Sequence, residues 1–206
     1  MSRGPDTPLP LPPADLGTRL LPAHRLDAPV VLFRIHLAEY QPLFFSPPSG
    51  NRPRGRFDSL SGRFRALYAA TTLAGAVVET LLRNPTEPLV TLSRLAPRAL
   101  AIVRIGRPLK LVDLTGPGLS QLGLDARLLS GPYDLCGAWA DSFHGHPSLA
   151  DGILYPSRFD PSARCVALFD RVLPALPRPA ESTPLLAMAE EIAAVLDRYG
   201  KALEPE

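Results

Sequence analysis

The chain has 206 residues, enough for one well-filled domain, and its 46% hydrophobic and 20% charged content is ordinary for a globular protein. A net charge of +2 is too small to indicate nucleic-acid binding by itself, and the sequence lacks the run of about 18 apolar residues that a membrane span needs. The two cysteines, Cys136 and Cys165, argue against a disulfide scaffold and favour a reducing cytosol. Since the first residues also lack the apolar core of a signal peptide, we expect a cytoplasmic protein.

The N-terminal part of the chain is rich in proline. Residues 1–28 contain Pro5, Pro8, Pro10, Pro12, Pro13 and Pro22. Such a segment favours extended conformations, so we expect an arm that wraps around the domain or frays from it and does not form core. Val30–His36 then predicts the first strand. The following segment, Pro42–Ser61, is rich in Pro, Gly, Ser and Arg, and loops of this length are uncommon unless they bind something.

Strands and helices then follow in an irregular order. They are a strand (Phe64–Ala69), a helix capped by Thr72 (Thr72–Arg83), two strands (Ala99–Ile105, Leu109–Leu114), two helices (Leu119–Leu129, Leu135–Phe143) and two strands (Gly152–Tyr155, Arg164–Phe169). This irregular mixture favours an α+β fold over a regular wound sheet of βαβ units.

The C-terminal part begins with a second proline-rich connector, which contains Pro174, Pro177, Pro179 and Pro184. The segment Leu185–Tyr199 then predicts a helix, because apolar residues recur in steps of about four and three. We expect this amphipathic helix to pack on its own domain, and a partner-binding helix is the alternative.

Arginine dominates the basic residues, since only Lys110 and Lys201 among the 22 cations are lysines. The densest cluster comprises Arg52, Arg54, Arg56, Arg63 and Arg65. Guanidinium groups suit phosphate, and Gly50 and Gly55 give the loop the backbone freedom that anion binding requires. A solvated basic loop and an RNA-binding surface, with Phe57 and Phe64 as stacking groups, are alternatives that spacing alone does not separate.

Three further residues could carry chemistry, and each has an ordinary structural alternative. Glu79 is a lone carboxylate at the end of an apolar run, but it could simply pair with Arg83 one turn later. Tyr68 could be an aromatic residue of the hydrophobic core, and the Ser157 side chain could simply form hydrogen bonds with nearby backbone groups. The residues Cys136, His144, His146 and Cys165 match no zinc spacing, so we expect no metal. Gly116-Pro117-Gly118 is not followed by the third glycine that the dinucleotide-binding motif of Rossmann folds requires.

The order of these residues resembles the RES domain, a bacterial family, over roughly residues 30–170. The resemblance rests on an arginine on the first strand (Arg34), the Gly-Arg-Phe loop (Arg56), the Leu-Tyr-Ala strand (Tyr68), the helix ending near Glu79, Trp139-Ala140 and the Asp-Gly-Ile-Leu-Tyr-Pro-Ser-Arg segment (Ser157). The proline-rich arm, the tail helix and Pro156 depart from the family pattern. On this basis we divide the chain into an arm (1–28), a RES domain (29–173) and a connector with a tail helix (174–206).

The resemblance implies a single α+β domain similar to ADP-ribosyltransferases, with a split, mostly antiparallel sheet and flanking helices that hold NAD in a cleft. It implies that Arg34 and Arg56 bind the pyrophosphate or a ribose, that Tyr68 stacks on nicotinamide and that Ser157 orients the phosphate or ribose side. Glu79 would stabilise the oxocarbenium-like sugar, so the predicted catalytic residues are Glu79, Arg34 and Ser157.

Family members are toxins of toxin–antitoxin pairs, so the resemblance implies an enzyme that breaks the nicotinamide–ribose bond of NAD. The acceptor of the ADP-ribosyl group is left open. Water would make the protein a glycohydrolase, phosphate a phosphorylase, and a protein side chain an ADP-ribosyltransferase. The implied partner is a helix-turn-helix antitoxin of the Xre type, with no metal, no membrane and no nucleic acid bound by the protein itself. A homodimer is left open. An arginine-rich RNA- or partner-binding module is the alternative from another functional class.

Overall fold

The computed structural model describes residues 8–45, 55–177 and 181–204. Their strands are β1 (Ala23–Leu26), β2 (Val30–Leu37), β3 (Ala66–Ala70), β4 (Leu89–Val90), β5 (Arg98–Ile105), β6 (Leu109–Asp113), β7 (Gly152–Pro156), β8 (Arg164–Phe169), β9 (Ser182–Pro184) and β10 (Ala202–Leu203). Their α-helices are α1 (Leu73–Leu81), α2 (Leu92–Leu95), α3 (Pro117–Gln121), α4 (Tyr133–His144) and α5 (Ala189–Asp197). Short 3₁₀ helices are η1 (Leu16–Thr18), η2 (Ala126–Leu129), η3 (Asp170–Ala175) and η4 (Leu185–Met188).

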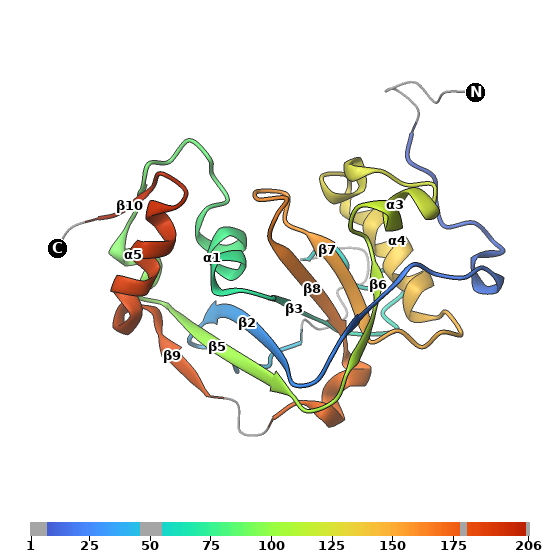
Figure 1. Ribbon diagram of the computed structural model, residues 1–206, viewed down its shortest axis with the longest axis horizontal. Coiled ribbons are helices and arrows are strands. Elements are labelled where there is room, and N and C mark those ends of the chain that lie inside the picture. Colours follow the sequence, from blue (N-terminus) through green and yellow to red (C-terminus); the bar gives the residue numbers. More distant parts are fainter. Residues whose placement is uncertain (1–7, 46–54, 178–180, 205–206) are drawn as a thin grey trace.

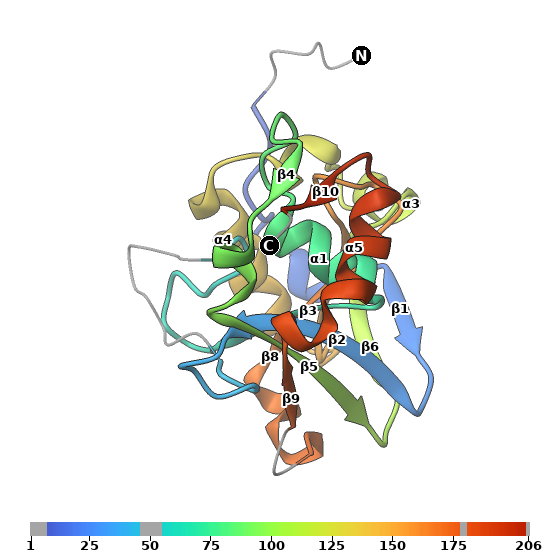
Figure 2. The ribbon, with the colours of Figure 1, turned by 90° about the vertical axis from the view of Figure 1, so that its left-hand side faces the viewer.

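Eight of these strands form one sheet in the order β1-β6-β7-β8-β3-β2-β5-β9. β6 and β7 run parallel, and the other neighbouring pairs are antiparallel. The apolar residues of β7 and β8 are buried almost throughout, as expected for strands that are covered on both faces. β4 and β10 form a separate parallel pair beside α5 (Figure 2).

The sheet is split between β2 and β3. β2 pairs with β5 along its whole length, from Val30 to Leu37, and β3 pairs with β8 along its whole length. In contrast, one register pair, Phe33 with Ala70, joins β2 to β3. Since β3 ends at Ala70, the two strands separate from this pair towards Ala66 of β3. The prediction of a single α+β domain with a split, mostly antiparallel sheet and flanking helices is confirmed.

Helices flank the central strands on two sides (Figure 1). α1 and α5 lie on one side of β7 and β8, and α3 and α4 lie on the other. Trp139 and Phe143 of α4 are fully buried in one hydrophobic cluster with Phe64 and Phe169. A second cluster joins α1 to α5 and includes Val77, Leu81, Ile192 and Leu196. The amphipathic tail therefore packs on its own domain, as predicted.

The helix α1 forms as its sequence predicts. The side chain of Thr72 accepts a hydrogen bond from the Gly75 amide at 3.0 Å, which satisfies one of the unpaired donors of the first turn. Its buried face ends at Leu81, and Glu79 and Thr80 are half-buried beside that face. This arrangement brings the single carboxylate of the helix close to the split in the sheet.

Three expectations from the sequence are wrong. Leu119–Leu129 is not one helix, because Gly123 adopts a positive φ of 70° that ends α3, and Asp125 caps the separate helix η2. The described part of the N-terminal arm does contribute to the core, since Leu16 is buried and β1 pairs with β6. The tail is not one α-helix, because it begins as the 3₁₀ helix η4, and the connector before it adds β9 to the sheet.

The helices in the described part of the chain are all too short or too polar to cross a bilayer.

Candidate functional site

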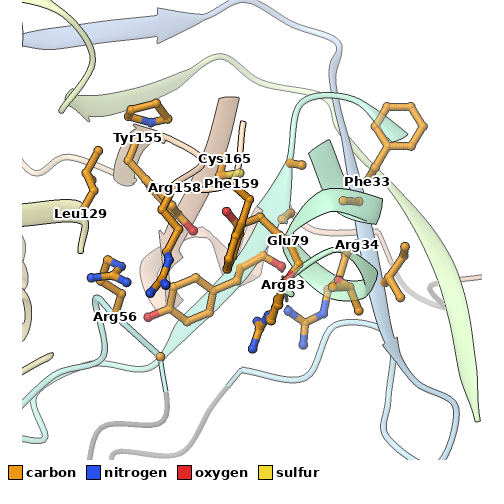
Figure 3. A pocket seen from close by; sticks show the side chains of 18 of the residues that line it. Phe33, Arg34, Arg56, Glu79, Arg83, Leu129, Tyr155, Arg158, Phe159 and Cys165 are labelled. Carbon is orange, nitrogen blue, oxygen red and sulfur yellow. Dashed lines mark hydrogen bonds between the residues drawn. The ribbon is translucent and has the colours of Figure 1, made fainter. Parts of the chain in front are cut away.

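A cavity of about 540 Å³ lies at the split between β2 and β3. Its walls come from β2, β3, α1, the loop at Gly55 and Arg56, the region Leu129–Tyr133, and the loop that joins β7 to β8. The sheet opens here because β2 and β3 share one register pair. The residues Arg34, Arg56, Tyr68 and Glu79, which the sequence singles out, all line this one cavity (Figure 3).

Glu79 reaches the cavity from the last turn of α1. Arg83 follows it by one turn, but its Nε donates to the main-chain carbonyl of Glu79 at 2.6 Å. The i,i+4 ion pair that was the structural alternative for Glu79 is therefore replaced by a contact to the backbone. Burial and then the negative charge of Glu79 raise the pKa of the Cys165 thiol, which also lines the cavity.

Arg34 bridges the two halves of the sheet. Its Nη1 donates to the carbonyl of Tyr68 on β3 at 2.7 Å, and its Nη2 donates to the carbonyl of Phe44 at 3.2 Å. The buried Nε has no hydrogen-bond partner among the described residues. Burial lowers the pKa of the Arg34 guanidinium to about 10, so the group stays cationic at neutral pH. Arg34 thus combines a structural role with a position in the cavity wall.

Asp58 organises the loop that presents Arg56. One oxygen of its carboxylate accepts from the Gly55 amide at 2.7 Å, and the other accepts from the Tyr68 hydroxyl at 2.9 Å. The same hydroxyl accepts from the Phe57 amide at 2.8 Å. Burial and then Asp58 raise the pKa of Tyr68 far above its usual value, so the hydroxyl remains a donor. The loop and the ring of Tyr68 are therefore fixed together.

Gly55 is required by this arrangement. A Cβ atom at position 55 would lie 2.5 Å from the hydroxyl end of Tyr68, and displacing the ring would disturb the two hydrogen bonds that hold this hydroxyl. We expect Gly55→Ala to lower the free energy of unfolding by about 1–3 kcal/mol, the usual cost of overpacking a filled site. Denaturant unfolding monitored by tyrosine and tryptophan fluorescence measures this loss.

Gly106→Ala is the matched control for Gly55→Ala, because a Cβ atom at position 106 would have no neighbour within 4 Å. We expect this exposed substitution to change the free energy of unfolding by less than about 0.5 kcal/mol. Equal stability of the two variants would show that Gly55 and Tyr68 do not pack as closely as described.

Arg56 enters the cavity from the same loop. Its Nη1 lies 3.3 Å from the carbonyl of Gly131 and 3.5 Å from that of Leu128, and its guanidinium lies 5.2 Å from the ring centroid of Tyr133. The carbonyls engage one terminal nitrogen, and the planar fork offers further donors. Arg52 and Arg54, the first two members of the predicted cluster, and Gly50 lie outside the described residues. Among the other members, Arg65 pairs with Asp170 away from the cavity.

Sequence reasoning missed Arg158 as a cavity residue and saw Arg83 only as an ion-pair partner. Both line the cavity, and the guanidinium of Arg158 lies 4.8 Å from the ring centroid of its neighbour Phe159. Arg158 could have been suspected because it follows Ser157 in a loop between two strands. Figure 3 shows Arg56 and Arg158 on one side of Glu79, Arg34 on the other, and Arg83 next to Glu79.

Ser157 is placed differently from the other predicted site residues. It is buried and is not among the residues that line the cavity. Its hydroxyl accepts from the amides of Phe159 at 3.1 Å and Asp160 at 3.3 Å, a local turn of the kind that serine side chains form. Ser157 therefore shapes the loop that carries Arg158 and Phe159 into the wall.

The cavity combines cationic, aromatic and acidic groups. Four arginines and one carboxylate stand among the described residues that line it, together with the rings of Phe33, Tyr68, Tyr133, Tyr155 and Phe159. Guanidinium groups bind phosphate in bidentate fashion, and aromatic faces stack on planar heterocycles. A single carboxylate among them can stabilise positive charge that develops on a bound molecule. The site is therefore suited to a phosphorylated ligand with a planar ring.

Comparison with known proteins agrees with the fold. A chain in the crystal structure of the M. tuberculosis MbcT–MbcA toxin–antitoxin complex is similar to this chain, with a TM-score of 0.58 and 20% identity, over 82% of this chain and 92% of that one. No curated protein matches the sequence. The family model of the RES domain matches residues 31–188. Since this match spans more than half of the sequence, the chain belongs to the RES domain family.

Proposed function

We propose that this protein is the toxin of a toxin–antitoxin pair and that it cleaves NAD at the nicotinamide–ribose bond. The observation that carries the proposal is the position of the Glu79 carboxylate in a cavity where the other charged lining residues that the structure describes are arginines. NAD provides a pyrophosphate for the guanidinium groups and a planar, positively charged nicotinamide for the aromatic rings. Membership of the RES domain family and the toxin–antitoxin origin of the similar structure support the toxin assignment.

Binding comes first in the proposed reaction. Arg56 and Arg158 on one side of Glu79 bind the pyrophosphate, and Arg34 on the other side contacts a ribose or phosphate oxygen. Tyr68 stacks on nicotinamide, because its hydroxyl is fixed by Asp58 and the Phe57 amide and its ring lines the cavity. Ser157 acts in this scheme by ordering the loop of Arg158.

Bond cleavage is electrostatically assisted. When the bond between nicotinamide and ribose breaks, the electron pair leaves with the nicotinamide nitrogen, and positive charge develops on the sugar. The carboxylate of Glu79 stabilises this oxocarbenium-like sugar. Nicotinamide departs as a neutral molecule, so no strong general acid is needed. A nucleophile then bonds to the anomeric carbon, and water, phosphate or a protein side chain can fill this role.

The antitoxin partner is proposed from the kind of assembly in which the similar structure occurs. That structure is described as a toxin–antitoxin complex. We propose a helix-turn-helix antitoxin that covers the cavity. RNA binding is less favoured, because Arg56 is directed into the cavity and Arg65 is paired with Asp170, so these two members of the cluster do not share one surface.

The test of the activity is direct. We expect the purified protein, freed of antitoxin, to release nicotinamide from NAD, as measured by liquid chromatography with mass detection of both products. ADP-ribose identifies hydrolysis, ADP-ribose phosphate identifies phosphorolysis, and a mass increase on a protein identifies transfer. Intact NAD after long incubation with protein whose folding is verified by circular dichroism would contradict the proposal.

A further inference from the structure

The loop between β7 and β8 forms one wall of the cavity. It contributes Arg158 and Phe159 to the lining, and its first turn is closed by Ser157 as described above. Its last turn is closed by a hydrogen bond from the Ala163 amide to the Asp160 carbonyl at 3.0 Å. These contacts define the internal shape of the loop, but they do not fix its orientation against the rest of the domain.

Asp160 links this loop to the C-terminal part of the chain. One carboxylate oxygen, Oδ1, accepts from the amide of Ser162 at 2.9 Å and from its hydroxyl at 2.6 Å. The other oxygen, Oδ2, accepts from the hydroxyl of Tyr199 at 2.6 Å. One oxygen therefore accepts hydrogen bonds from within the loop, and the other accepts a hydrogen bond from a residue 39 positions further along the chain.

Tyr199 is a firm anchor for this contact. It follows α5, its amide donates to the Leu196 carbonyl at 2.9 Å, and its ring packs against the hydrophobic cluster that joins α1 to α5. Phe159 packs against the same cluster. Leu196 and Ile192 of α5 are fully buried there. The loop thus contacts the cluster through Phe159 and is hydrogen-bonded through Asp160 to Tyr199, the residue that follows α5.

We propose that Tyr199 is a positioning residue for the NAD pocket, because its hydroxyl holds Asp160 and thereby fixes the loop that carries Arg158 and Phe159. The inference rests on the proposed function of the cavity. Tyr199 lies beyond residue 188, where the family match ends, so the role belongs to a part of this chain that the family model does not include.

The protonation states of the pair suit this role. Burial and then Asp160 raise the pKa of the Tyr199 hydroxyl to about 12, so the group remains a donor at physiological pH. Hydrogen bonds from Ser162 and then from Tyr199 lower the pKa of Asp160, so the carboxylate remains ionised. A hydroxyl that donates to a carboxylate forms a short and strong hydrogen bond, which agrees with the distance of 2.6 Å.

Tyr199→Phe removes the hydroxyl and keeps the ring in the cluster. We expect KM for NAD to rise about tenfold, the ratio that corresponds to the loss of one charge-assisted hydrogen bond. We expect kcat to stay within about twofold of the parent, because the loop supplies binding groups and Glu79 is held separately on α1. Steady-state kinetics of nicotinamide release measure both constants. A fall in kcat with KM unchanged would overturn the proposal.

Lys201→Met is the matched control in the tail. The Lys201 ammonium donates to the carbonyls of Pro85 and Glu87, so the substitution loosens the tail at another point and does not touch Asp160. We expect its KM to equal that of the parent. Asp160→Ala should raise KM at least as much as Tyr199→Phe, and adding Tyr199→Phe to it should have no further effect. Additive effects of the two substitutions would overturn the proposal.

Hydrogen exchange separates this inference from the proposed function. Without any ligand, the amides of residues 157–163 should exchange faster in Tyr199→Phe than in the parent and in Lys201→Met. If the parent neither binds nor consumes NAD, the proposed function fails, and faster exchange still supports the contact as the restraint on the loop. Unchanged exchange in Tyr199→Phe overturns the inference, whatever the activity of the parent.

Discussion

Glu79→Gln is expected to lower kcat for NAD cleavage by about 100- to 1,000-fold, the usual effect of removing one well-placed electrostatic contact to the transition state. Glutamine keeps the size of the side chain but removes the negative charge that, in the proposed reaction, stabilises the developing sugar cation. Affinity for NAD should stay near that of the parent, because the arginines and aromatic rings of the cavity are unchanged. Nicotinamide release gives kcat, and calorimetric titration with NAD gives the affinity.

Glu87→Gln is the control for charge removal, since Glu87 pairs with Arg94 and is not among the residues that line the cavity. It should retain full activity and lose at most about 0.5 kcal/mol of stability. Expression of the parent, but not of Glu79→Gln, should arrest growth. Full activity of Glu79→Gln would move the catalytic role to another residue. A thermal stability near that of the parent would show that the loss of activity is not caused by unfolding.

Arg56→Lys should weaken NAD binding by about ten- to a hundredfold, although it preserves the positive charge. The guanidinium of Arg56 contacts main-chain carbonyls with Nη1 and still has donors for a phosphate, whereas a lysine ammonium is a point charge that cannot bridge both. The affinity is best measured by calorimetry in the Glu79→Gln background, where NAD is not consumed during the titration.

Arg65→Lys is the matched control, because Arg65 belongs to the same cluster in the sequence but pairs with Asp170 away from the cavity. It should bind NAD as tightly as the parent. If Arg56→Lys binds NAD like the parent, the pyrophosphate lies elsewhere in the cavity. If Arg56→Lys leaves NAD binding intact and weakens binding of a single-stranded RNA, the alternative function as an RNA-binding module is supported instead.

The sequence predicts those helices and strands that depend on interactions between residues close together in the chain. Thr72 caps α1 because its hydroxyl can reach the Gly75 amide, and the apolar run after it has the length of a short helix. The tail packs on its own domain because its apolar residues share one face. The helix over 119–129 fails for a local reason as well, since Gly123 permits a positive φ and Asp125 can cap a new turn. The burial of Leu16 depends on distant partners, which the sequence does not identify.

The candidate site is predictable in part. Arg34, Arg56, Tyr68 and Glu79 are singled out by residue type and order, and the fold brings them to one cavity. The position of Arg158 in the wall depends on the course of a loop between two strands. The contact between Asp160 and Tyr199 depends on where the tail returns to the sheet. Long-range contacts of this kind leave no periodic signal in the sequence, so the three-dimensional structure is needed to identify them.

The two roles of Arg34 affect how catalytic activity can be inferred for relatives of this protein. Its guanidinium links the two halves of the sheet by donating a hydrogen bond to the Tyr68 carbonyl across the split between β2 and β3, and it also lines the cavity. Selection for a stable fold would preserve this arginine even in a descendant that has lost catalysis. The Glu79 carboxylate forms no hydrogen bond or ion pair within the described part of the chain, so drift can remove it at little structural cost. Under the proposed mechanism, position 79 therefore distinguishes an active relative from an inactive one better than position 34 does.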